Sequence, residues 1–148
     1  MTKTTRMLFI VMAVALGAQV VACKKPREAA NAREMKEKLS DKVGWGLWKI
    51  DATEAQEAKT DKMLDELAPD LFRFQQESKA IKRGLIRVFM EDEVVLEKIL
   101  EHQKAGLDLF DRYTRRMSRA GVEAADILTR EQRLELVNMW RRWEFGED

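Results

Sequence analysis

Apolar residues recur at helical spacing along the chain. One set advances in steps of three and four with Ser78 at its single polar position, and it comprises Leu64, Leu67, Leu71, Phe74, Ile81, Leu85 and Val88. That spacing places the set on one stripe of a long amphipathic helix. Pro69 lies inside the stripe and is expected to kink or divide the helix, because proline removes a backbone donor and crowds the preceding turn.

A second stripe predicts another long helix, for which Asp92 could supply the N-cap and Gly121 the end. It comprises Leu96, Leu100, Gln103, Leu107, Phe110, Thr114 and Met117. A last helix is expected from Thr129, with Leu136, Trp140 and Trp143 on one side. No sustained period-2 alternation and no Asn-Gly or Asp-Gly turn indicates a strand. We therefore predict an all-α fold of long antiparallel helices in a hairpin-like four-helix arrangement.

The stretch 1–22 has the three zones of a secretory signal. Lys3 and Arg6 give a positive start, the stretch 7–18 is almost wholly apolar, and the small residue Ala22 precedes Cys23. This pattern predicts a signal peptide over residues 1–22. A permanent membrane-spanning helix is the alternative, although the uncharged run is short against the ~20 residues that usually cross a bilayer.

Val20-Val21-Ala22-Cys23 resembles the bacterial lipobox. The resemblance implies that Cys23 is lipidated and acylated, with chains such as palmitate, and begins a mature lipoprotein anchored in the bacterial cell envelope and facing the periplasm. Several acyl chains anchor a protein durably, whereas one gives only reversible binding. In enterobacterial lipoproteins an aspartate at the next position favours the inner membrane, so Lys24 favours the outer one. The alternative is an ordinary signal peptide followed by an unmodified cysteine.

The mature chain is expected to divide at residue 44. Residues 23–44 are polar and charged with sparse apolar positions, and we interpret them as the lipidated cysteine and a tether, which could be helical in part. Residues 45–148 would form the helical domain, with an irregular stretch over 43–50, where two glycines and two tryptophans occur. The formal net charge of the chain is only +1 at pH 7, and export makes nucleic acid an unsuitable partner.

Two short motifs predict helix starts. Thr53 and Thr129 are each followed three residues later by glutamine, at Gln56 and Gln132. In a capping box the threonine hydroxyl accepts from a backbone N–H and the glutamine reaches back to the threonine N–H. With Leu128 the second motif becomes a full LTxxQ, while the first has alanine at the leucine position.

A small, exported, all-helical chain with two such motifs resembles the Spy/CpxP family of periplasmic stress proteins over residues 45–143. The resemblance implies a four-helix hairpin that dimerises into a curved cradle. It implies binding of unfolded or aggregation-prone envelope proteins without ATP, or damping of a membrane stress sensor. A related branch of the family binds zinc, nickel or copper, which makes metal sensing or metal resistance an alternative function.

Flexible cationic side chains and methionines suit a surface that binds many different unfolded proteins, which we call clients. The residues that we expect to contact clients on this basis are Arg83, Arg87, Arg112, Arg115, Arg116, Arg119, Met90 and Met117. The alternative is that the arginines form a solvated helix face and that the methionines fill the core.

The sequence gives less support to metal binding or catalysis than to client binding. His102 is the single histidine and a weak metal candidate, because the positions one turn away hold Lys98, Ile99, Ala105 and Gly106. The sequence carries no phosphate-binding loop and no nucleophile elbow, and a second histidine for an acid–base relay is lacking. We therefore expect no enzyme activity and no cofactor.

Overall fold

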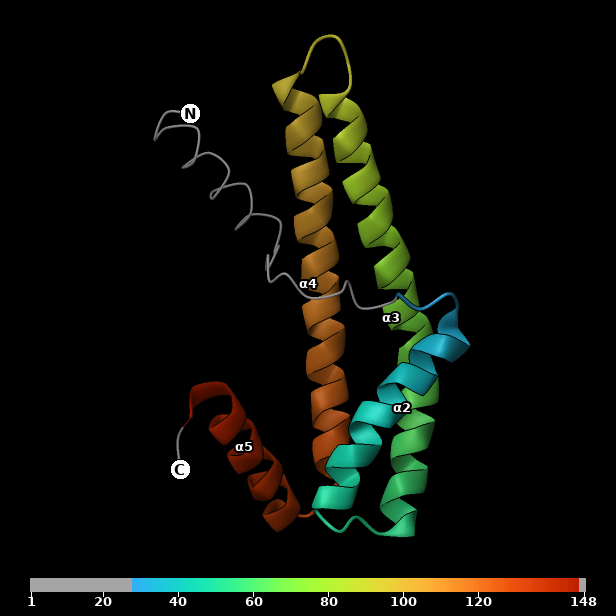
Figure 1. Ribbon diagram of the computed structural model, residues 1–148, viewed down its shortest axis with the longest axis vertical. Helices are drawn as coiled ribbons and strands as arrows, with labels where there is room; N and C mark the ends of the chain where they lie inside the picture. The colour runs from blue at the N-terminus through green and yellow to red at the C-terminus, as the bar shows by residue number, and fades with distance from the viewer. Residues whose placement is uncertain (1–27, 147–148) are drawn as a thin grey trace.

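The computed structural model describes residues 28–146, and in this range the regular structure is helical (Figure 1). The helices are α2 (Ala32–Lys49), α3 (Glu54–Phe89), α4 (Leu96–Ile127) and α5 (Arg130–Phe145), and no strand occurs among these residues. The all-α prediction is confirmed. The predicted signal peptide and Cys23 lie outside the described residues. Of the helices in the described range, none combines the length and the apolar character needed to cross a membrane.

The long helices α3 and α4 form an antiparallel hairpin, and α2 lies across the half of it that contains the start of α3 (Figure 1). We call this half the junction end, and we call residues 86–96 the hairpin tip. α5 begins at the junction end and leads away from α4 (Figure 1). The main packing is α3 on α4 and α2 on α3, so α5 is the least covered helix.

The core lies at the junction end, beneath α2. Its buried cluster joins α3 to one residue of α4 and comprises Leu64, Leu67, Leu71 and Ala120. The partly buried side chains that pack against it come from α2, α3 and α4: Met35, Leu39, Val43, Met63, Phe74 and Met117. Further along the hairpin, Phe74 meets Tyr113 edge to face with ring centroids 5.6 Å apart.

The N-terminal part of the domain differs from the prediction. The segment 43–50 is not irregular, because α2 runs through it to Lys49, and the expected domain boundary at residue 44 falls inside this helix. Residues 32–42, interpreted as tether, are the first part of α2. Met35, Leu39 and Val43 recur at every fourth position and pack against the core, and Leu47 at the next such position is buried, so these apolar side chains help to dock a mostly polar helix.

Polar contacts also hold α2 in place. Asn31 caps the helix by accepting from the backbone N–H of Glu34 at 2.8 Å. The Lys36 ammonium lies 2.7 Å from Asp65 and 3.1 Å from Asp61, both on α3. Hydrogen bonding to Asp65, and then to Asp61, raises the pKa of Lys36 above its usual value.

One local expectation for the hairpin is narrowed, and two others need revision. α3 continues through Pro69 as one helix, so the proline does not divide it. Asp92 does not cap α4, because the N-cap is Val95 and no side-chain hydrogen bond caps the helix there. Gly121 does not end α4, which continues to Ile127. The buried neighbour Ala120 packs in the core, and this tertiary contact outweighs the weak helix preference of glycine.

Candidate functional site

Both predicted capping boxes are present, at the starts of α3 and α5. Thr53 and Thr129 are the N-cap residues, and their hydroxyls accept from the backbone N–H three residues on at 3.3 and 3.2 Å. The side-chain oxygens of Gln56 and Gln132 accept in return from the threonine N–H groups at 2.9 and 3.0 Å. The motifs therefore begin their helices in the way that capping boxes do.

The two glutamines also meet each other. Gln56 Nε2 donates to Gln132 Oε1 over 2.7 Å, and Gln132 Nε2 donates back to Gln56 Oε1 over 3.1 Å. Gln56 Nε2 also donates to the carbonyl of Ile127 at 3.0 Å, and Gln132 Nε2 to the carbonyl of Ile50 at 3.3 Å. Ile127 is the last residue of α4 and Ile50 is the C-cap of α2. Carbonyl groups at the end of a helix have no N–H partner within the helix, so the two glutamine amides supply the missing donors. We call these four residues the glutamine junction.

Arg133 strengthens the same corner. Its Nη1 atom donates to the carbonyls of Ala125 and Leu128 at 2.7 and 2.9 Å, so a residue of α5 caps the end of α4. Leu128, the leucine of the full LTxxQ motif, is the half-buried C-cap of α4. The sequence interpretation did not predict this contact of Arg133, although its position one turn after the N-cap threonine places it beside the preceding helix end. The motif residues thus join the ends of four helices.

The expected client-binding arginines do not form one cluster. Arg116 is largely buried, with 18 % of its side chain exposed, and lies 2.9 Å from Asp70 of α3. Arg112 pairs with a glutamate of α3 at 2.5 Å, and Arg115 pairs with Asp111 one turn back at 2.9 Å. These three arginines therefore contribute to ion pairs within the chain.

The other expected client-binding residues are spread over the hairpin. Arg83 and Arg87 are exposed on α3 towards the hairpin tip, where Met90 is 78 % exposed. Arg119 is exposed on α4. Met117 packs against the core, as the alternative interpretation expected for a methionine.

His102 lies in a notch between the two long helices. A Cβ atom added to Gly84 of α3 would be 2.1 Å from Nε2 of His102, so the glycine makes room for the imidazole. Nδ1 lies 2.9 Å from the carbonyl of Lys98, and since a carbonyl can only accept, Nδ1 is the donor. Among residues 28–146 no group of three potential ligands converges on a metal position. This geometry assigns His102 a packing role.

Most of the exposed large apolar side chains lie in two regions. The first, which we call the α5 surface, combines α5 with the end of α2 and comprises Trp45, Trp48, Leu134, Val137, Trp140 and Phe145. Trp140 and Phe145 pack edge to face at 5.6 Å, and the Lys49 ammonium lies 4.6 Å from the Trp48 ring. The second, which we call the upper face, lies on the hairpin beyond α2 and comprises Ile86, Phe89, Leu96, Leu100, Leu107 and Phe110.

Comparisons with protein-family models, with curated proteins and with solved structures found no match. The functional argument therefore depends on the surfaces and contacts described above.

Proposed function

We propose that this chain is an envelope lipoprotein that binds unfolded or aggregation-prone proteins without ATP. The observation that carries the proposal is the α5 surface, where aromatic and aliphatic side chains are exposed on a helix that the rest of the domain scarcely covers. Contiguous exposed apolar surface is uncommon in monomeric soluble proteins and usually marks a place where another molecule binds.

The position of α5 suits such binding. The helix is fixed at its start by the capping box of Thr129 and by Gln132 and Arg133. Its later part leads away from α4 (Figure 1), and Val137 and Trp140 on this part are exposed. A firmly attached helix with an uncovered apolar surface can accept different client segments by many weak contacts. The proposal shifts the expected contacts from the paired arginines to these side chains.

A client-aggregation assay tests this proposal. Purified protein should suppress aggregation of chemically unfolded lysozyme in the absence of ATP. Replacing Leu134 and Val137 by serine should abolish most of the suppression, because it removes exposed apolar contacts without opening the core. A matched variant with serine at the exposed positions Glu135 and Asn138 should retain it. Equal activity of the two variants would contradict the assignment of the surface.

The same experiment separates the other possible functions. Suppression that requires added zinc would favour a metal-dependent protein, and no suppression under either condition would favour docking onto a membrane stress sensor. The proposal includes a homodimer, for which light scattering of the purified protein measures the mass.

A further inference from the structure

We propose that the upper face lies on the surface of the lipid bilayer, so that the chain contacts the membrane through this face as well as through the lipid on Cys23. The side chains of the upper face are between 45 and 64 % exposed. This inference depends on the lipidation of Cys23 proposed above, and it adds a second point of membrane contact that is independent of the α5 surface.

On α3, the upper face continues the side that α2 covers. Leu71 is buried in the core, and Phe89 follows it after about five complete helical turns. Gln75 binds Ala29, and Ile86 follows Gln75 after about three turns. Phe89 and Ile86 therefore point to the same side of the hairpin as the N-terminal segment and α2.

On α4, the same continuation holds. Met117 packs against the core together with residues of α2, and Phe110 precedes it by about two turns. Leu96 and Leu107 are separated by about three turns and share one side, whereas the buried Leu109 lies about half a turn away from Leu107. α2 thus covers the junction half of this side of the hairpin, and within residues 28–146 the remaining half, which carries the apolar residues of the upper face, has no cover (Figure 1).

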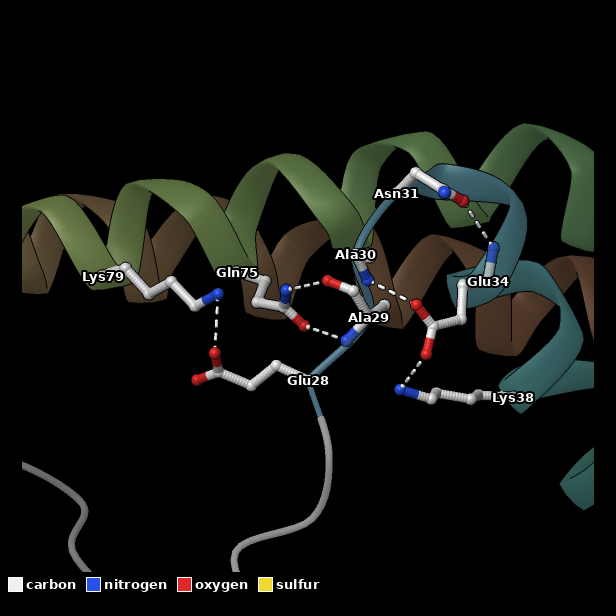
Figure 2. Close-up of polar contacts among 8 residues, drawn as sticks. All are labelled: Glu28, Ala29, Ala30, Asn31, Glu34, Lys38, Gln75 and Lys79. Atoms are coloured by element: carbon white, nitrogen blue, oxygen red, sulfur yellow. Dashed lines mark hydrogen bonds and ion pairs between the residues drawn. The ribbon is translucent and has the colours of Figure 1, made fainter.

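The position of the N-terminal segment brings the lipid to this side. Figure 2 shows Glu28 paired with Lys79 at 2.6 Å and Ala29 bonded to the Gln75 amide through both its N–H, at 3.2 Å, and its carbonyl, at 2.8 Å. A fully extended chain from Cys23 to Glu28 would span at most about 17 Å. Lys79 and Phe89 are about 15 Å apart along α3. The bilayer that holds Cys23 is therefore within reach of the upper face.

The charges suit a lipid surface. Lys82 follows Leu71 after about three turns, on the same side of α3, and both Lys82 and Lys104 of α4 are exposed. Such side chains can bury their methylene stems in apolar surroundings while the ammonium reaches lipid phosphates. Lys24 and Lys25 follow Cys23 directly and add attraction to anionic lipids. The acidic loop 91–93 disfavours end-on insertion of the hairpin tip, so the hairpin is expected to lie along the surface.

Lipid quenching of a site-specific fluorophore tests the inference. Cys23 is the only cysteine and would be blocked by its lipid, so Leu107→Cys introduces the one reactive thiol. The full lipidated protein, labelled there with an environment-sensitive dye, is reconstituted into phosphatidylethanolamine and phosphatidylglycerol vesicles that contain nitroxide lipids. Ala105→Cys is the control, because this exposed position is close in sequence but lies on the far side of α4.

We expect the dye at position 107 to shift its emission to shorter wavelength and to be quenched several-fold more strongly than the dye at position 105. Equal quenching at the two positions overturns the inference. A blue shift at position 107 without lipid quenching also overturns it, since a second copy or a client would then cover the face. Flotation with the vesicles reports the anchor separately. If the protein floats but the dye at position 107 is not quenched, the lipoprotein assignment stands and the membrane contact of the upper face is wrong. If the protein does not float, both the lipoprotein assignment and the membrane contact are wrong. Circular dichroism establishes that both labelled variants remain folded.

Discussion

The glutamine junction makes a definite prediction for stability. In the variant Gln132→Ala, the side chain that joins α5 to the ends of α2 and α3 is removed. Gln132 donates to the carbonyl of Ile50 and to Gln56, and it accepts from Gln56 and from the backbone N–H of Thr129. The variant loses all of these hydrogen bonds at once, while Gln56 keeps its contact with the carbonyl of Ile127.

The expected loss in the free energy of unfolding is about 2 kcal/mol. A hydrogen bond contributes about 0.5–1.5 kcal/mol net, and a buried group left without its partner costs more. Thr129 is exposed, so water can replace its lost partner. Ile50 is only 3 % exposed, and water reaches its carbonyl less easily. The contacts with Ile50 and Gln56 therefore account for most of the loss, which corresponds to a decrease of roughly 6–10 °C in Tm for a domain of this size.

Chemical denaturation followed by circular dichroism measures this loss. Gln76→Ala is the matched control, because Gln76 is exposed on α3, and it should change stability by less than about 0.5 kcal/mol. The double variant with Gln56→Ala should be less destabilised than the sum of the single variants, by about 1 kcal/mol, since the two side chains share hydrogen bonds. Hydrogen exchange should also accelerate in α5. Additive single effects, or a Gln132→Ala protein as stable as the control, would refute the role of the junction.

Three further substitutions or titrations follow from the same contacts. Gly84→Ala should lower the free energy of unfolding by about 1–3 kcal/mol, because the new Cβ would lie 2.1 Å from the imidazole of His102. Gly106→Ala is the control: its Cβ meets nothing within 4 Å, and the variant should be more stable by about 0.5–1 kcal/mol. Shifts in Tm of the same sign for the two variants would contradict this prediction. Arg116→Ala should lower the free energy of unfolding by about 1–2 kcal/mol and Arg115→Ala by less than about 0.5 kcal/mol, since only the Arg116 ion pair is largely shielded from water. Equal denaturation midpoints for the two variants would show that burial does not distinguish the ion pairs of Arg116 and Arg115. Hydrogen bonds to two aspartates raise the pKa of Lys36, so the ion pairs of Lys36 stabilise the fold fully below the ordinary lysine pKa of 10.5 and are lost only as the pH rises through the higher pKa of the folded state. An NMR titration of the Lys36 ammonium should give a midpoint above 10.5. An ordinary midpoint would disprove the effect.

The sequence by itself determined where most helices lie and how two of them begin. Helical periodicity and the Thr/Gln motif are local, because they involve residues within one or two turns, and the structure has both capping boxes at Thr53 and Thr129. Local rules were wrong where a tertiary contact competes with them. α4 continues past Gly121 because its neighbour Ala120 is buried, and α2 forms because Met35 and Leu39 reach a core made by other helices.

Only the tertiary structure decided which apolar residues are covered. The stripe of Leu96, Leu107 and Phe110 reads in the sequence as a packing surface, yet α4 buries the neighbouring Leu109 and leaves that stripe exposed. The tertiary structure also paired Gln56 with Gln132, 76 residues apart. Periodicity fixes the side of a helix on which a residue lies, but it does not specify what faces that side. What faces each side depends on packing between segments that are distant in the sequence. This packing determines where the glutamine junction, the α5 surface and the upper face lie.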